Sequence, residues 1–240
     1  MISIIIPTLN EEKVIGGMLK SLKSQLTLPH ELIVSDGKST DKTVEIAKKY
    51  ADKVIVYDGN KRQTIAEGRN AGAAAAHGEF LIFFDADCSI PDTSAFFTRA
   101  IEDFKDSKLV ALTAWLTVYP KDETFGDKII FNVQNAIVFM IDNIFHGGMA
   151  PGGEFQMIRA EIFRKIGGFR GQLVASEDID MFSRLAKVGR VKIDYRLKVY
   201  HSGRRGHKIG WPKLLSLWFL NTVWMTIMGR AFVKEWKPIR

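Results

Sequence analysis

The sequence predicts an α/β fold with a mainly parallel sheet flanked by helices and a small antiparallel addition in its second half. Short apolar runs of strand length alternate with helical segments from residue 2 to residue 84, which is the pattern of a parallel sheet. The run Phe-Leu-Ile-Phe-Phe at residues 80–84 contains no polar residue and lies between Gly78 and Pro91. Such a run is typical of a strand buried on both faces.

The first half of the chain carries the alternation most clearly. We expect strands at residues 2–6, 32–34, 54–57 and 80–84, and helices at 11–26, 43–50 and 65–76. Asn10 is the expected N-cap of the first helix, with Glu11 and Glu12 in a first turn that favours acids.

The second half mixes the two element types less regularly. We expect helices at residues 93–105, 128–145 and 176–188, and strands at 109–118, 154–159, 191–195 and 199–201. No internal repeat or low-complexity linker divides the chain. We therefore predict one domain over residues 1–205, whose first half (1–90) binds one substrate and whose second half (91–205) completes the site.

Composition narrows the class of protein. The 240 residues are 46% hydrophobic, enough for a sizeable core, and the net charge of +7 suits an anionic partner such as a nucleotide or an acidic membrane face. The single cysteine, Cys88, excludes an intramolecular disulfide and a cysteine-based zinc site. The N-terminus shows no secretory signal pattern, so we expect a cytoplasmic location.

The end of the 80–84 strand carries the first candidate site. Asp85 and Asp87 flank Ala86 where the strand should leave the core, and ligands of open α/β sheets bind at that edge. Two carboxylates there can hold Mg²⁺ or Mn²⁺ and, through the ion, a diphosphate. The alternative is a turn or helix cap, where short acids are common. The first three connections contain neither Gly-x-Gly-x-x-Gly nor a P-loop, which disfavours both of those nucleotide sites.

Five segments in order carry a family resemblance: residues 4–12 (Ile-Ile-Ile-Pro-Thr-Leu-Asn-Glu-Glu), 36–43 (Asp-Gly-Lys-Ser-Thr-Asp-Lys-Thr), 68–72 (Gly-Arg-Asn-Ala-Gly), 85–87 (Asp-Ala-Asp) and 177–180 (Glu-Asp-Ile-Asp). Together they resemble the motifs of the inverting GT-A glycosyltransferases of family 2, over about residues 2–201. The resemblance implies a GT-A catalytic domain at 1–205, with a nucleotide-binding half at 1–90 and an acceptor half at 91–205.

On the donor side, the resemblance implies a nucleotide-sugar site. Its residues would be Pro7, Thr8, Glu11, Asp36, Arg69, Asp85 and Ala86. Asp36 would accept a hydrogen bond from a uracil ring, although Gly37 stands where many members carry a second acid. Arg69 would face the diphosphate. The alternatives are a turn formed by Asp36 and a surface ion pair of Arg69 with Glu67.

The implied metal is Mn²⁺ or Mg²⁺. Asp87 would be the principal ligand and Asp85 would contact the ribose, the ion or its bound water. His201 is the candidate third ligand because it follows the last strand. Arg204 and Arg205 beside it would close over the diphosphate.

The second half would supply the chemistry of inversion. Asp178 resembles the family's catalytic base, which takes the proton of the acceptor hydroxyl, and Glu177 would orient it or the acceptor. The alternative is structural: Ser176 would cap a helix whose dipole favours acids in its first turn, and Asp180 would pair with Arg184.

The tail at residues 206–240 differs from the rest. Residues 214–228 contain no charge, and Lys213 and Arg230 flank them. The run falls short of the roughly 20 residues that span a bilayer. It suits a helix in the membrane interface, a buried core helix or an oligomer contact.

The resulting prediction is a metal-dependent inverting glycosyltransferase. It would move a sugar from a nucleoside diphosphate, UDP by the resemblance, to the hydroxyl of a glycan or lipid-linked acceptor, and it would not bind nucleic acid. The alternatives are a polyprenyl-phosphate sugar synthase and a non-catalytic nucleotide-sugar-binding subunit on a membrane. A nucleotidyltransferase is disfavoured because residues 7–11 lack its Gly-rich basic loop.

Overall fold

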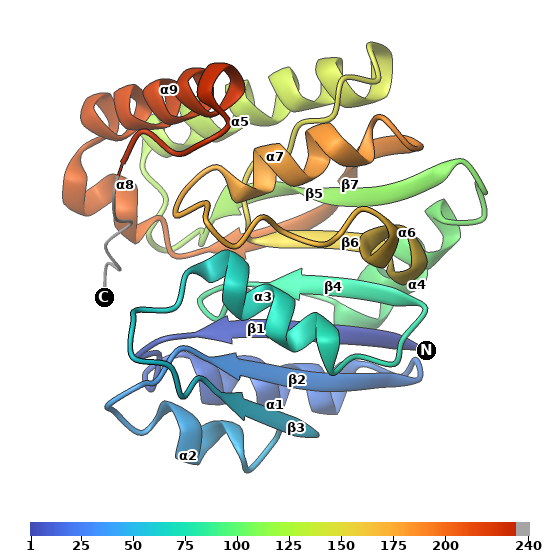
Figure 1. Cartoon of the computed structure of the whole chain (residues 1–240), viewed down its shortest axis with the longest axis vertical. Helices are drawn as coiled ribbons and strands as arrows, with labels where there is room; N and C mark the ends of the chain where they lie inside the picture. Colours follow the sequence, from blue (N-terminus) through green and yellow to red (C-terminus); the bar gives the residue numbers. More distant parts are fainter. Residues whose placement is uncertain (234–240) are drawn as a thin grey trace.

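The computed structural model describes residues 1–233 of the chain and confirms the α/β prediction. One seven-stranded sheet runs in the order β3-β2-β1-β4-β6-β5-β7 (Figure 1). Its strands are β1 (Ile2–Thr8), β2 (His30–Asp36), β3 (Lys53–Val56), β4 (Phe80–Phe84), β5 (Leu109–Val118), β6 (Phe155–Arg159) and β7 (Arg190–His201). The sheet is mostly parallel, with β6 antiparallel to both of its neighbours.

Helices cover both faces of this sheet (Figure 1). They are α1 (Ile15–Gln25), α2 (Thr43–Ala47), α3 (Ile65–Ala74), α4 (Thr93–Asp103), α5 (Phe125–Phe139), the π-helical turn η1 (Met140–Ile144), α6 (Ala160–Lys165), α7 (Glu177–Leu185), α8 (Arg204–Ile209) and α9 (Trp211–Met228). Residues of α1, α4 and α5 form the core on one face, and residues of α3, α6 and α7 form it on the other.

The central strand is buried on both faces, as its sequence predicts. Phe80, Ile82 and Phe84 belong to one core and Leu81 and Phe83 to the other. Alternate side chains of a strand point to opposite faces, so only an apolar run without polar interruption satisfies both.

The antiparallel direction of β6 decides which residues meet at the carboxyl edge of the sheet. Phe84, the last residue of β4, pairs with Phe155, the first residue of β6. The next residues outward are therefore Asp85 on one strand and Glu154 on the other, and Asp85 N donates to Glu154 O at 3.3 Å.

The expected start of the first helix is wrong. The helix α1 begins at Ile15, and Asn10 lies in the left-handed region with φ 55° rather than capping it. Asn10 Oδ1 instead accepts from Thr40 N at 2.8 Å, and Glu11 N donates to Thr43 Oγ1 at 2.7 Å. Residues 9–14 thus form a loop that packs against the loop around residues 40–43. These tertiary contacts use the polar groups that would otherwise cap the helix.

Other boundaries also differ from expectation; for example, the helix expected at 128–145 is α5 at Phe125–Phe139 followed by η1. The segment expected as two strands at 191–195 and 199–201 is the single strand β7, because the register against β5 shifts between Ala114 and Trp115 and absorbs the irregular residues. The helix expected through residue 50 ends at Ala47.

The C-terminal segment forms α8 and α9, and α9 lies alongside α5 (Figure 1). Trp211 Nε1 donates to Asp127 Oδ1 of α5 at 2.8 Å, and the Trp211 and Phe131 rings are 5.5 Å apart. Only Leu214, Asn221 and Met225 of α9 are buried, so it is not a core helix.

Within residues 1–233, the helices fall short of the length and hydropathy needed to cross a bilayer. The end of the predicted tail, residues 234–240, lies outside the described residues.

Candidate active site

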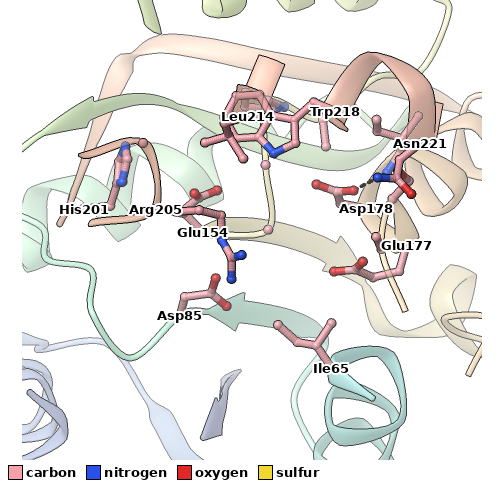
Figure 2. Close-up of a pocket in the computed structure, with 18 of the residues that line it drawn as sticks. Ile65, Asp85, Glu154, Glu177, Asp178, His201, Arg205, Leu214, Trp218 and Asn221 are labelled. Carbon is pink, nitrogen blue, oxygen red and sulfur yellow. Dashed lines mark hydrogen bonds between the residues drawn. The ribbon is translucent and has the colours of Figure 1, made fainter. Parts of the chain in front are cut away.

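A cavity of about 890 Å³ opens at the carboxyl edge of the sheet (Figure 2). It brings together most of the residues that the sequence singled out from distant segments. The following line it: Pro7, Thr8, Arg69, Asp85, Asp87, Glu177, Asp178, His201, Arg204 and Arg205. Glu11, Asp36 and Ala86 are not part of the lining and lie just behind it, all three buried. The Asp-x-Asp and Glu-Asp segments therefore face one space.

Arg69 joins these two acidic segments. Its guanidinium is fully buried and donates from Nη1 to Glu177 Oε1 at 2.8 Å and from Nη2 to Asp85 Oδ1 at 3.2 Å. Nη2 also donates to Gly153 O at 3.0 Å, and the guanidinium lies 5.4 Å from the centre of the Phe169 ring. The predicted alternative, an ion pair with Glu67, is absent from these contacts because Glu67 binds Lys61 at 2.6 Å.

Position 153, in the loop before β6, has to be glycine for the Arg69 guanidinium to fit beside it. A Cβ at Gly153 would collide with the Arg69 guanidinium. The absence of a side chain lets the carbonyl of residue 153 approach the buried cation and satisfy one of its donors.

Arg204 forms a second bridge, at the start of α8. Its Nη2 and Nη1 donate to the two carboxylate oxygens of Glu11 at 2.9 and 3.2 Å, a bidentate pair. Its Nε lies 3.2 Å from Asp87 Oδ2, which also accepts from Ser202 Oγ at 2.5 Å. Glu11 therefore reaches the site through Arg204 rather than by lining the cavity.

Crowded carboxylates make the site electrostatically unusual. Burial, followed by the repulsion of neighbouring acids, raises the pKa of Asp85 to about 6, of Glu177 to about 7 and of Glu154 to about 8. Arg69 partly opposes the shift at Asp85 and Glu177. Burial also raises the pKa of Asp178. A cation bound among these carboxyl groups would favour their ionised form.

The two acids at the start of α7 have different surroundings. Glu177 is held by Arg69, whereas Asp178 Oδ1 accepts from Ile179 N of its own helix at 2.8 Å. Ser176 is in the left-handed region with φ 61° and its side chain does not cap the helix, so the capping alternative is wrong. The expected pair of Asp180 with Arg184 is present at 2.8 Å.

Asp36 is fully buried beneath the first strand end. Its Oδ1 accepts from Thr8 Oγ1 at 2.8 Å and from Ser39 Oγ at 2.6 Å, and its Oδ2 accepts from Ser39 N at 2.7 Å. These contacts give its carboxylate the turn-forming role that the sequence offered as the alternative.

The predicted metal ligands share the cavity, and the two aspartates fit a cation better than the histidine does. Carboxylate oxygens suit Mg²⁺ and Mn²⁺, and Asp85 and Asp87 both line the cavity. His201 Nδ1 accepts from Gly203 N at 3.2 Å, so the neutral ring carries its proton on Nε2 and has no lone pair to offer there. Burial lowers the pKa of His201 to about 4, which keeps the ring neutral. Within residues 1–233, three or more His, Cys, Asp or Glu side chains do not converge into a metal cluster.

Sequence reasoning missed Glu154, which faces the cavity beside Asp85 (Figure 2). Its Oε2 is buried and has no hydrogen-bond partner among the described residues. The Gly152-Gly153 pair before a strand was a usable signal. This signal was not decisive, because Glu154 comes before a strand. A residue in that position lies at the carboxyl edge of the sheet only if its strand runs antiparallel to the neighbouring strands.

The apolar wall of the cavity was also not foreseen. Apolar residues of α5 and α9 form it, among them Ile129 and Ile137 of α5 and Leu214 and Trp218 of α9. Figure 2 shows Leu214 and Trp218 on the other side of the view from Asp85.

Comparison with known proteins agrees with the family resemblance found in the sequence motifs. Residues 3–167, more than half of the chain, match the model of "Glycosyl transferase family 2". The succinoglycan biosynthesis protein ExoA of Rhizobium meliloti is 30% identical over 200 residues, which cover 78% of this chain and 58% of that relative. The chain thus spans less than two thirds of the relative's length.

Solved structures share the fold. The mannosyltransferase PcManGT of Pyrobaculum calidifontis, in complex with GDP-Man and Mn²⁺, superposes with a TM-score of 0.74 at 19% identity, covering 94% of this chain and 64% of that one. The glucosyl-3-phosphoglycerate synthase of Mycobacterium tuberculosis, in complex with Mn²⁺ and UDP-glucose, gives 0.64 at 19% identity, covering 92% and 78%.

Proposed function

Because the chain belongs to glycosyltransferase family 2, we propose that it is a metal-dependent inverting transferase. It moves a sugar from a nucleoside-diphosphate donor to an acceptor hydroxyl. Residues 1–90 bind the nucleotide and residues 91–205 bind the acceptor. The donor we propose to test first is a UDP-sugar, on the resemblance of the first two motifs.

One observation carries the proposal: a single buried arginine ties the Asp-x-Asp segment to the Glu-Asp segment. Arg69 bonds to Asp85 and to Glu177, residues 92 positions apart, and all three line one cavity. A donor phosphate at the first segment and an acceptor at the second would then approach the same sugar carbon.

The residues of this chain divide the chemistry between them. Asp178 takes the proton of the acceptor hydroxyl as its oxygen bonds to the anomeric carbon, and the bond from that carbon to the diphosphate breaks with its electron pair leaving on the phosphate. Glu177, clamped by Arg69, fixes the start of α7 and is a positioning residue. The raised pKa of Asp178 brings its proton affinity closer to that of a base working near neutral pH.

Asp87 and Asp85 would hold the cation, which offsets the charge that grows on the departing diphosphate. Arg204 lies against Asp87 and supplies a guanidinium on the same side of the cavity. His201 contributes an N–H donor rather than a lone pair. Asp36 and Glu11 support the nucleotide half from behind, through Thr8 and Arg204.

The decisive experiment compares Asp178→Asn with the native chain. We expect UDP release in the presence of acceptor to fall by roughly 10²–10⁴-fold, the usual contribution of a general base. Binding of the UDP-sugar in the presence of Mn²⁺, measured by calorimetry, should be retained. Removal of the cation with EDTA should abolish release in the native chain, and Mn²⁺ or Mg²⁺ should restore it.

Glu161→Gln is the matched control, because Glu161 also lies in the first turn of a helix but outside the cavity. It should leave the rate unchanged. If Asp178→Asn keeps full activity, the acceptor does not need a base, which favours the phosphate acceptor of a polyprenyl-phosphate sugar synthase. If the native chain binds no nucleotide sugar, the proposal fails entirely.

A further inference from the structure

The helices α5 and α9 expose a large apolar surface around the mouth of the cavity. On α5 and η1 the exposed positions repeat every three or four residues along one side of the helix, as Phe125, Ile129, Val133, Ile137, Met140 and Ile144. On α9 the exposed apolar side chains include Leu215, Phe219, Val223, Trp224 and Ile227. A contiguous apolar area of this kind marks a surface that is covered in use.

This surface is continuous with the candidate active site. Ile129, Val133 and Ile137 of α5 and Leu215 and Phe219 of α9 are at once solvent-exposed and part of the cavity lining. Trp211 at the start of α9 contacts Asp127 and Phe131 of α5, and the two helices lie together in Figure 1. Figure 2 shows Asp85 and Glu177 on the other side of the view from Leu214 and Trp218. Whatever covers this surface therefore also meets the entrance to the site.

The exposed charged side chains on the helices themselves are basic. The two acids of α5 and η1, Asp127 and Asp142, are fully buried. The exposed charged residues within these helices are Lys128 on α5 and Lys213 on α9, with Arg230 just beyond α9. Lys128 lies 3.6 Å from Glu123, which precedes α5 beside the exposed Asp122, so Lys213 and Arg230 are the basic flanks of the surface. Apolar and aromatic side chains with basic flanks match an anionic bilayer, where the side chains enter the acyl boundary and the cations meet the phosphates.

We propose that the α5–α9 surface lies on the surface of an anionic lipid bilayer, with the cavity mouth facing the lipid. Membrane binding has one consequence that rests on the proposed function: the acceptor enters the site from the membrane. The acceptor is then amphipathic: its hydroxyl reaches Asp178 while its hydrocarbon part lies between α5 and α9. The helices rest in the interface and do not cross it, in agreement with their length.

The test measures co-sedimentation of the whole chain with vesicles, without donor or acceptor. The chain should sediment with phosphatidylcholine vesicles that contain phosphatidylglycerol, much less with phosphatidylcholine alone, and less as salt is raised. The double variant Phe125→Ser/Ile227→Asn removes two exposed side chains outside the cavity lining and should weaken partitioning roughly tenfold or more.

Val56→Asn is the matched control, because Val56 is an exposed apolar residue on β3, at the opposite end of the sheet from β7. It should bind vesicles as the native chain does. Circular dichroism of each variant checks that the fold is kept.

Two results would overturn the inference. One is a chain that stays in the supernatant with every vesicle. The other is a chain that self-associates in sedimentation velocity, becomes monomeric in the double variant and ignores lipid, since a second copy would then be the occupant. A chain that binds UDP-sugar but no vesicle defeats only this inference, whereas one that binds vesicles but no nucleotide sugar defeats only the proposed function.

Discussion

Two arginines hold the acids of this site, and they do so in different environments. Arg69 is fully buried, and its contacts with Asp85, Glu177 and a carbonyl fix the floor of the cavity. Arg204 has 30% of its side chain exposed and joins Glu11 to Asp87 at the rim.

This difference in burial indicates that the Arg69 contacts are fixed by the fold, whereas the Arg204 contacts can rearrange. A fully buried cation has no water to replace a lost partner, so its geometry is tied to folding. A half-exposed cation can exchange a carboxylate for a phosphate at small cost. We therefore expect Arg69 to govern stability and Arg204 to govern donor binding.

The largest expected effect is that of Arg69→Met. Removing the guanidinium leaves the buried Glu177 and the partly buried Asp85 without their partner, which should destabilise the fold by about 3–5 kcal/mol. Urea denaturation followed by circular dichroism measures the loss. Arg69→Lys is the conservative comparison and should recover only part of it, because one ammonium cannot reproduce the two-sided fork. An Arg69→Met chain as stable as the native one would break the comparison.

A smaller effect on stability is expected for Arg204→Met. Glu11 loses a bidentate partner at a partly wet site, at a cost of about 1–3 kcal/mol. Binding of UDP-sugar with Mn²⁺ should weaken roughly tenfold, the loss of one charge-assisted contact to phosphate. Calorimetry of donor binding measures this, with Arg99→Met as a control because Arg99 pairs with Asp194 away from the cavity lining. Unchanged donor affinity would show that Arg204 is a second scaffold.

An effect that depends on pH concerns Glu154, whose Oε2 has no hydrogen-bond partner among the described residues. Its pKa is raised from 4.5 to about 8, so between these pH values the folded chain keeps a proton that the unfolded chain releases. The stability that this group contributes is present at low pH and is lost as pH rises towards about 8. Glu154→Gln should flatten that decline in thermal melts across the same pH range. An identical decline in both chains would show that Glu154 is ionised throughout.

Much of the fold was readable from the chain because its signals are local. The apolar run at 80–84, the strand–helix alternation and the acids at strand ends each follow from neighbouring residues, and the structure has the strands there. The prediction of Asn10 as a helix cap was wrong because its side chain accepts a hydrogen bond from Thr40 N, 30 residues further along the chain. The hydrogen bond from Gly203 N to His201 Nδ1 joins two nearby residues, but only the folded chain shows that it occupies this lone pair of the predicted ligand.

The sequence by itself determined the order of the elements and the identity of most acids at the edge of the sheet, since periodicity and strand ends are properties of short segments. Tertiary structure alone decided that β6 runs antiparallel and so places Glu154 beside Asp85. It also decided that Arg69 joins residues 92 positions apart and that α5 and α9 together line the cavity. Such pairings depend on strand direction and helix packing, which are settled by the burial of the whole core and leave no trace in any single stretch of the chain.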